Sequence, residues 1–176
     1  MRSETLINLL NLVEEPNRIK CVALWRDYKE RIDIAPGSSD KHQAWPGGYI
    51  HHLEETMNFA VELYDIMSKH RKLDFNISDV ILVLFLHDLE KPFVLVEPKL
   101  RFETEEDKIN FVISKAREYG IELSELHENA LRFIHGEGKH YSKTERIQKP
   151  LAAFVHICDT VSARIWFDYP KVSNKE

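Results

Sequence analysis

His87 and Asp88 are the residue pair in this sequence best suited to chemistry, because they directly follow the seven apolar residues 80–86. A segment that is apolar on all sides is normally surrounded by protein, so both side chains are expected inside the fold. A buried carboxylate without a counter-charge is very costly, and divalent transition metals accept imidazole and carboxylate ligands. The pair therefore predicts a metal site, with a core helix whose polar end reaches water as the alternative.

Asp159 and His52 extend this pair. Asp159 is the only carboxylate in the nearly apolar helical pattern 150–166, so a buried Asp159 needs a cation, a strong hydrogen-bond donor or a metal. In the helix predicted over residues 49–70, His52 lies about 100° from the centre of the apolar stripe, at its border, whereas His51 lies about 160° away on the solvent side. A divalent ion held by two imidazoles and two carboxylates keeps positions open for water and substrate, which indicates hydrolytic chemistry.

Helices must position these residues, because nearly every segment of the chain has apolar residues at helical spacing. A buried helix contains the apolar run and ends or kinks at Lys91-Pro92, and residues 93–96 form a short extended or helical piece. Turn-forming residues predict a loop over residues 34–48. The predicted fold is a compact all-α helical bundle. Its other helices are predicted over residues 6–13, 16–28, 49–70, 104–119, 124–134 and 150–166.

Length and composition set the broad class of the protein. The 176 residues fit one domain, 43% of them are apolar and 30% charged, and no apolar run reaches the roughly 20 residues that span a bilayer. No signal-peptide pattern opens the sequence, so a soluble cytoplasmic protein is expected. Cys21 and Cys158 lie in apolar helical patterns and are predicted to be reduced core residues. The net charge of −5 argues against a broad nucleic-acid-binding surface, although it permits a local basic groove.

Three segments of the sequence resemble the HD-domain superfamily of metal-dependent phosphohydrolases, all-α proteins whose signature is a histidine, an HD pair and a later aspartate. Residues 42–52 (HQAWPGGYIHH) place paired glycines one helical turn before His52. Residues 84–91 (LFLHDLEK) are similar to the apolar-HD-apolar-x-K run of the family. Residues 156–164 are similar to its final helix, which carries a single aspartate.

By this resemblance, residues 1–176 form one HD-type helical domain. Its core is expected over residues 45–167, preceded by N-terminal helices in residues 1–33 and followed by a tail in residues 168–176. The resemblance implies one divalent transition metal ion per chain, chosen from Mn, Fe, Co, Ni and Zn, with Mg as a further candidate. The expected substrate is a nucleotide or a related small phosphoester, and a homo-oligomer is possible. The alternatives are a nuclease that trims nucleic-acid ends and a regulatory module that binds metal without catalysis.

The resemblance also assigns roles to individual residues. It implies that His52, His87, Asp88 and Asp159 ligate the metal. Asp88 would in addition orient the attacking water. Lys91, which lies three residues from Asp88 on a helix, would face the site and bind a substrate phosphate as a point charge.

Three further histidines are candidates for a second metal or for a phosphate. Some members of the superfamily hold a second ion with extra histidines between the HD pair and the last aspartate. His135 is the first candidate here, followed by His140 and His127. Their spacing does not reproduce the usual set, so one ion is expected.

Other polar residues are candidates for substrate binding. The connection 138–149 holds five groups that can carry positive charge, which predicts an anion-binding loop, with a solvated surface loop as the alternative. Lys139, Lys143 and Arg146 would bind substrate there. Trp45 lies close to the paired glycines and could line a pocket for a base or a sugar, although an aromatic residue at such a position is more often part of the core.

Overall fold

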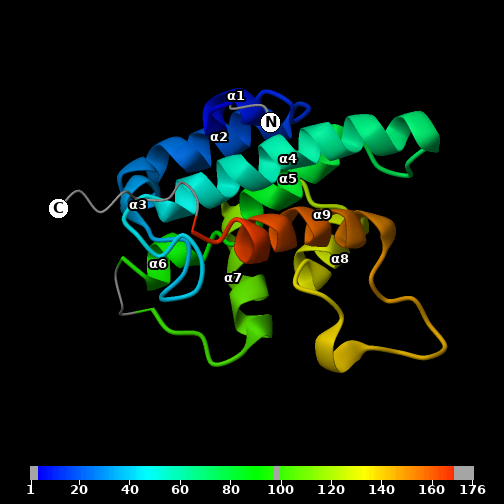
Figure 1. Cartoon of the computed structure of the whole chain (residues 1–176). Helices are drawn as coiled ribbons and strands as arrows, with labels where there is room; N and C mark the ends of the chain where they lie inside the picture. The colour runs from blue at the N-terminus through cyan, green and yellow to red at the C-terminus, as the bar shows by residue number, and fades with distance from the viewer. Residues whose placement is uncertain (1–3, 97–99, 169–176) are drawn as a thin grey trace.

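The computed structural model describes residues 4–96 and 100–168, and every regular element in these ranges is helical, which confirms the predicted all-α fold. The long helix α4 crosses the molecule, and α1, α3, α8 and α9 pack against it or its neighbour α5 (Figure 1). Helices α2, α6 and α7 lie outside these and contact α1, α3 and α8. The α-helices are α1 (Leu6–Leu10), α2 (Asn17–Asp27), α3 (Lys29–Ile34), α4 (Gly48–His70), α5 (Ile77–Leu86), α6 (Lys91–Val94), α7 (Glu105–Glu118), α8 (Glu125–Phe133) and α9 (Pro150–Thr160). A 3₁₀ turn, η1 (Gly138–His140), and a π-helical turn, η2 (Val161–Ile165), complete the set.

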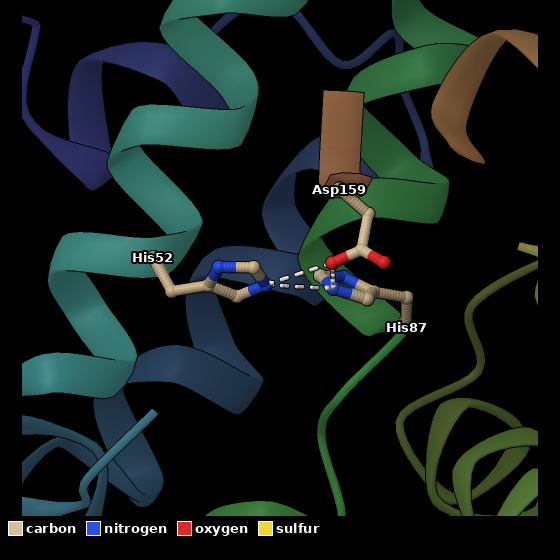
Figure 2. A group of neighbouring side chains, drawn as sticks. All are labelled: His52, His87 and Asp159. Atoms are coloured by element: carbon tan, nitrogen blue, oxygen red, sulfur yellow. Dashed lines mark hydrogen bonds and ion pairs between the residues drawn. The ribbon is translucent and has the colours of Figure 1, made fainter. Parts of the chain in front are cut away.

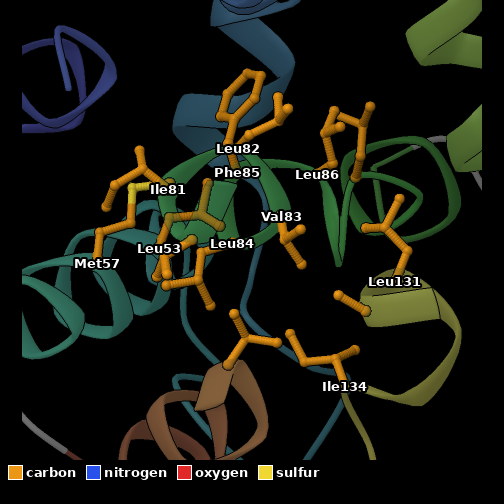
Figure 3. Packing of buried hydrophobic residues seen from close by; sticks show 14 of the residues in the cluster. Leu53, Met57, Ile81, Leu82, Val83, Leu84, Phe85, Leu86, Leu131 and Ile134 are labelled. Atoms are coloured by element: carbon orange, nitrogen blue, oxygen red, sulfur yellow. The ribbon is translucent and has the colours of Figure 1, made fainter. Parts of the chain in front are cut away.

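Helix α5 forms the centre of the hydrophobic core. It contacts α1, α4, α8 and α9, and every side chain from Val80 to Leu86 is buried. Figure 3 shows these side chains packed among Leu53 and Met57 on one side and Leu131 and Ile134 on another. Full burial of one such side chain stabilises a fold by about 1.5–3 kcal/mol. The apolar run therefore holds the polar pair that follows it firmly in place.

Reciprocal capping interactions fix the starts of three helices. Asn76 precedes α5, Thr104 precedes α7 and Ser124 precedes α8. In each case the cap side chain accepts a hydrogen bond from the backbone N–H three residues later, and that later side chain accepts one from the backbone N–H of the cap. The helix starts predicted near residues 104 and 124 are confirmed.

The end of α5 differs from the predicted one. The helix stops at Leu86, and hydrogen bonds of 3.0 Å from Leu89 N to Leu86 O and from Lys91 N to Asp88 O close two tight turns before α6 begins. Pro92 occupies the first turn of α6, where a proline is tolerated, and it disfavours continuous helix through the residue before it. His87 and Asp88 consequently lie on a turn at the inner end of α5. The piece that follows Pro92 is helical.

The predicted helix over residues 150–166 is divided into α9 and the π-helical turn η2. Trp166 N donates to Val161 O over 3.1 Å, a bond that spans five residues and widens the turn. Ser162, which lies in this wider turn, is fully buried and contacts residues of α4. The widened turn therefore connects the last helix with the helix that carries His52.

The remaining expectations concern the surface and the chain ends. Cys21 and Cys158 are buried and form no disulfide, as predicted, and burial raises the pKa of both thiols, that of Cys21 to about 12. None of the helices described by the structure combines the length and the apolar character that crossing a bilayer requires. The predicted tail over residues 168–176 lies outside the described residues, apart from Asp168.

Candidate metal centre

Three helices bring two histidines and one aspartate together in the interior. His52 lies in the second turn of α4, His87 follows the last residue of α5, and Asp159 is the penultimate residue of α9. Figure 2 shows the three side chains pointing toward one another. The exposed fractions are 0% for His52, 6% for His87 and 7% for Asp159. His51 is exposed, so the prediction that His52 is the inward-facing histidine of the pair is confirmed.

The distances within this cluster fit ligands of a single ion. His52 Nε2 lies 3.3 Å from His87 Nε2 and 3.3 Å from Asp159 Oδ1. His87 Nε2 lies 3.9 Å from the same carboxylate oxygen. One ligand atom from each of the three residues lies within 4.8 Å of the others. The site could therefore hold one metal ion.

Hydrogen bonds at the outer nitrogens set the tautomers of both imidazoles. His87 Nδ1 lies 2.7 Å from Leu84 O, a carbonyl that can only accept, so Nδ1 carries the proton. His52 Nδ1 lies 2.9 Å from Ser162 Oγ, whose own proton goes to Glu55 Oε2 at 2.5 Å, so this nitrogen is a donor as well. In their neutral forms both rings turn a lone pair on Nε2 toward the other. Two facing lone pairs repel each other, and either a proton on His87 or a metal ion between the rings removes this repulsion.

Gln43 completes the support behind His52. Its side chain is fully buried, and Nε2 donates to Glu55 Oε2 over 3.1 Å and to Ser162 Oγ over 3.2 Å. Partners of this kind fix the orientation of a ligating imidazole and raise its basicity. Gln43, Glu55 and Ser162 therefore form a supporting network that links the loop before α4, α4 itself and the π-helical turn η2.

The paired glycines are explained by the backbone at Gln43, which has a φ of 40°. Gly48 packs so closely on it that a Cβ at this position would lie 1.8 Å from Gln43 O. Gly47 has a φ of 82°, a conformation that glycine adopts without strain. The glycines thus allow the loop to pack closely against the start of α4. This packing places the side-chain amide of Gln43 within hydrogen-bond distance of Glu55 and Ser162.

We expect Ser162→Ala to weaken metal binding by about ten- to a hundredfold, the usual effect of removing a partner of a metal ligand. The change leaves the Nδ1 proton of His52 and the carboxylate of Glu55 without their shared hydroxyl. Titration calorimetry with Mn²⁺ measures the affinity, and Ser68→Ala on the exposed end of α4 is the matched control. An unchanged affinity in Ser162→Ala would show that the network does not position His52.

Asp88 lies beside the cluster on the side of Lys91. Its Oδ2 is 3.3 Å from His87 Nε2, 3.5 Å from His52 Nε2 and 2.5 Å from Lys91 Nζ. None of these contacts has the alignment of a hydrogen bond, and the oxygen is buried. A buried carboxylate oxygen without an aligned donor fits a position next to a metal ion.

The electrostatics of the cluster keep both carboxylates ionised. Burial would raise the pKa of Asp159, but the imidazole of His52 and the charge of His87 lower this pKa to about 2. Burial would also raise the pKa of Asp88, yet Lys91 and His87 hold it well below its usual range. Burial lowers the pKa of His52 to about 4. For His87, the charges of Asp88 and Asp159 outweigh burial and raise the pKa to about 9, so a proton occupies the cluster when no metal does.

A cavity of about 150 Å³ opens directly above the cluster. Its wall includes Asp88, Lys91, His135 and Asp159, and Lys41 and His42 from the loop before α4. The cavity gives a ligand of the size of a phosphate group access to the carboxylates from one side.

The three additional histidines have different surroundings. His135 lies past the end of α8, and its half-exposed ring places Nε2 3.8 Å from Asp88 Oδ1 and 3.9 Å from Asp159 Oδ2. His127 is bound to Asp79 at 2.8 Å through Nε2, while its Nδ1 accepts the backbone N–H that caps α8, so it stabilises helix starts. His140 stacks edge-on against Phe133. Of the three, the structure brings His135 to the cluster.

The predicted substrate-binding residues lie apart from the cluster. Lys143 and Arg146 line a cavity of about 520 Å³, which shares no lining residue with the cavity above the cluster. Lys139 lies in the 3₁₀ turn η1 and lines neither cavity. Trp45 donates from Nε1 to His51 Nδ1 over 3.1 Å, on the exposed side of α4.

Sequence reasoning missed the residues that support the cluster. Gln43, Glu55 and Ser162 are ordinary polar residues of a loop and two helices, and no spacing rule links them. The adjacent glycines are the one local signal, because they indicate a close backbone approach at this point.

Comparisons of the chain with models of known protein families, with curated proteins and with solved structures gave no match. The fold and the site by themselves define a class: an all-helical domain with a buried cluster of two histidines and one aspartate that could hold one metal ion.

Proposed function

We propose that this chain is a metal-dependent phosphohydrolase of the HD type that hydrolyses a nucleotide or a related small phosphoester. The observation that carries the proposal is the pair of Nε2 atoms of His52 and His87, 3.3 Å apart, between the carboxylates of Asp88 and Asp159. Because both Nδ1 atoms are bound to acceptors, the inner nitrogens are available as ligands. A divalent cation at this point would supply Lewis acidity, which polarises a phosphoryl oxygen and makes water a stronger nucleophile at neutral pH.

The donor set favours a transition metal. Two imidazoles with carboxylates suit Mn, Fe, Co, Ni or Zn better than a site built from oxygen ligands alone. Within residues 4–96 and 100–168, the cluster is the one group of histidine, cysteine and acidic side chains that meets the geometry for an ion. A single ion per chain is therefore proposed, with His135 at its solvent side.

Lys91 supports a phosphate as the reacting group. Its side chain is largely buried, lines the cavity above the cluster and pairs with Asp88. Asp88 would help to hold a metal ion, and Lys91, which pairs with Asp88 in this structure, would then be available to bind an anionic oxygen of the substrate. Asp88 is ionised and can accept a hydrogen bond from the attacking water. The reaction joins the oxygen of that water to phosphorus and breaks the P–O bond to the leaving group, which is an alcohol in a phosphomonoester and a phosphate in a nucleoside diphosphate. A proton of the water goes to that leaving oxygen.

Hydrolysis of a panel of nucleotides and p-nitrophenyl phosphate with Mn²⁺, Co²⁺, Ni²⁺ or Mg²⁺ tests the proposal. We expect Lys91→Met to lower kcat/KM by roughly ten- to a hundredfold, the effect of removing one charged contact to phosphate, while metal stoichiometry stays unchanged. Lys69→Met, on the exposed end of α4, is the matched control. Full activity in Lys91→Met would remove this lysine from the reaction.

Two other outcomes would contradict the proposal. Degradation of a labelled oligonucleotide that is lost in Lys91→Met, with no turnover of small phosphoesters, would identify a nuclease. Stoichiometric metal without turnover of any phosphoester would identify a module that binds metal without catalysis.

A further inference from the structure

A larger cavity of about 480 Å³ adjoins the one above the metal cluster. The two cavities share Lys41, His42 and Lys91 in their walls, so these residues stand at the passage from one to the other. The volume lies within the range of about 300–1,000 Å³ that is typical of pockets for small ligands. A ligand with one end at the cluster can therefore extend its other end into the larger cavity.

The larger cavity carries an excess of positive charge in a chain whose net charge is −5. Its wall holds four cationic side chains, those of Lys41, Lys91, Arg101 and Lys108, against the two carboxyl groups of Asp40 and Glu90. In the part of the chain that the structure describes, no carboxylate forms an ion pair with the side chain of Arg101 or of Lys41. Lys108 pairs with Glu105 at 2.6 Å, in an exposed contact that a ligand can displace at little cost. Two unpaired cations at one cavity favour an anionic ligand.

The same cavity also offers an aromatic surface. Phe102 lines it with a half-buried ring, and the ring of Phe111 lies behind with a centroid distance of 5.2 Å. The side chains of Val94 and Leu95 continue this apolar wall. A planar ring of a ligand can stack on such a surface, a contact that does not depend on a particular hydrogen-bond pattern.

We propose that the larger cavity binds the distal part of a nucleotide that carries at least two phosphate groups. One phosphate lies above the cluster, a second lies among Lys41, Arg101 and Lys108, and the base lies against Phe102. The position of the first phosphate rests on the proposed phosphohydrolase function, whereas the charge and the aromatic wall of the larger cavity do not depend on it.

Titration calorimetry on metal-free protein tests the cavity without catalysis. We expect ADP to bind roughly tenfold more tightly than AMP, and Arg101→Gln to remove this difference, because one charged hydrogen bond is lost. Phe102→Ala should weaken binding of ADP but leave binding of inorganic pyrophosphate unchanged. The control is Arg71→Gln, at the exposed end of α4. Equal affinity of wild type and Arg101→Gln for ADP would overturn the proposal. It would also be overturned if a single-stranded oligonucleotide bound more tightly than ADP and lost this affinity in Arg101→Gln.

Activity with metal separates this proposal from the phosphohydrolase function. Arg101-dependent binding of ADP without any turnover would support the cavity and contradict the hydrolytic function. Turnover of ADP with a KM that does not change in Arg101→Gln would support the function and contradict the cavity. A rise in KM of roughly tenfold in Arg101→Gln, with kcat retained, supports both.

Discussion

Asp159→Ala is expected to abolish stoichiometric metal binding and to lower the rate of phosphoester hydrolysis by more than about a hundredfold. This loss exceeds the roughly ten- to hundredfold effect of removing a residue that only hydrogen-bonds to a metal ligand. Asp159 contributes the carboxylate of the buried His/His/Asp cluster, and its Oδ1 lies 3.3 Å from His52 Nε2. Removing it leaves two facing imidazoles without the negative charge that favours a cation. Metal content of the purified protein and hydrolysis rates with added Mn²⁺ measure the two effects.

A matched variant separates this result from a general loss of stability. Asp74→Ala removes an exposed aspartate between α4 and α5 and should retain both metal and activity. Circular dichroism should show the helical content of the wild type in both variants. Normal metal content in a folded Asp159→Ala protein would disprove the metal centre as described.

The metal-free protein is expected to lose stability between pH 7 and pH 9. The charges of Asp88 and Asp159 outweigh burial and raise the pKa of His87 to about 9, above the value near 6.5 of an unfolded chain. The folded state therefore holds a proton that the unfolded state releases, and the resulting stabilisation is complete below pH 6.5 and lost as the pH rises through 9. The shift corresponds to about 3 kcal/mol in the free energy of unfolding. Urea unfolding at a series of pH values measures it.

Measurements on a His87 variant and with added metal identify the group that causes this pH dependence of stability. His87→Gln should remove the pH dependence in this window, since glutamine does not titrate. Added Mn²⁺ should stabilise the protein more at pH 9 than at pH 6, because at lower pH the ion must displace the proton of His87. A pH dependence that persists in His87→Gln would assign it to another group.

Much of the fold and of the cluster followed from periodicity. The apolar run before His87 required a buried element, and the helical wheel of residues 49–70 turned His52, not His51, toward the interior. The isolated carboxylate of Asp159 in an apolar helix required a positive partner. These inferences hold because burial along a helix is set by local spacing, which a sequence records directly.

The supporting network and the larger cavity could not be predicted in this way. Gln43 reaches Glu55 and Ser162 only because the loop adopts a positive φ and the last helix widens into a π-helical turn. Arg101 and the loop before α4 line the same cavity through the packing of distant segments. Such contacts depend on tertiary structure. The cations Lys143 and Arg146 lie close together in the sequence and therefore predicted an anion-binding loop, but they line a cavity separate from the cluster.

The close approach of Gly48 to Gln43 has a consequence for mutational tolerance. A side chain at position 48 would have to displace a main-chain carbonyl, which no choice of rotamer avoids. Saturation mutagenesis should therefore find position 48 as intolerant as the histidines of the cluster, although glycine contributes no functional group. In directed evolution of this chain, the segment before α4 would have to stay fixed, while the wall around Arg101 and Phe102 remains free to change specificity.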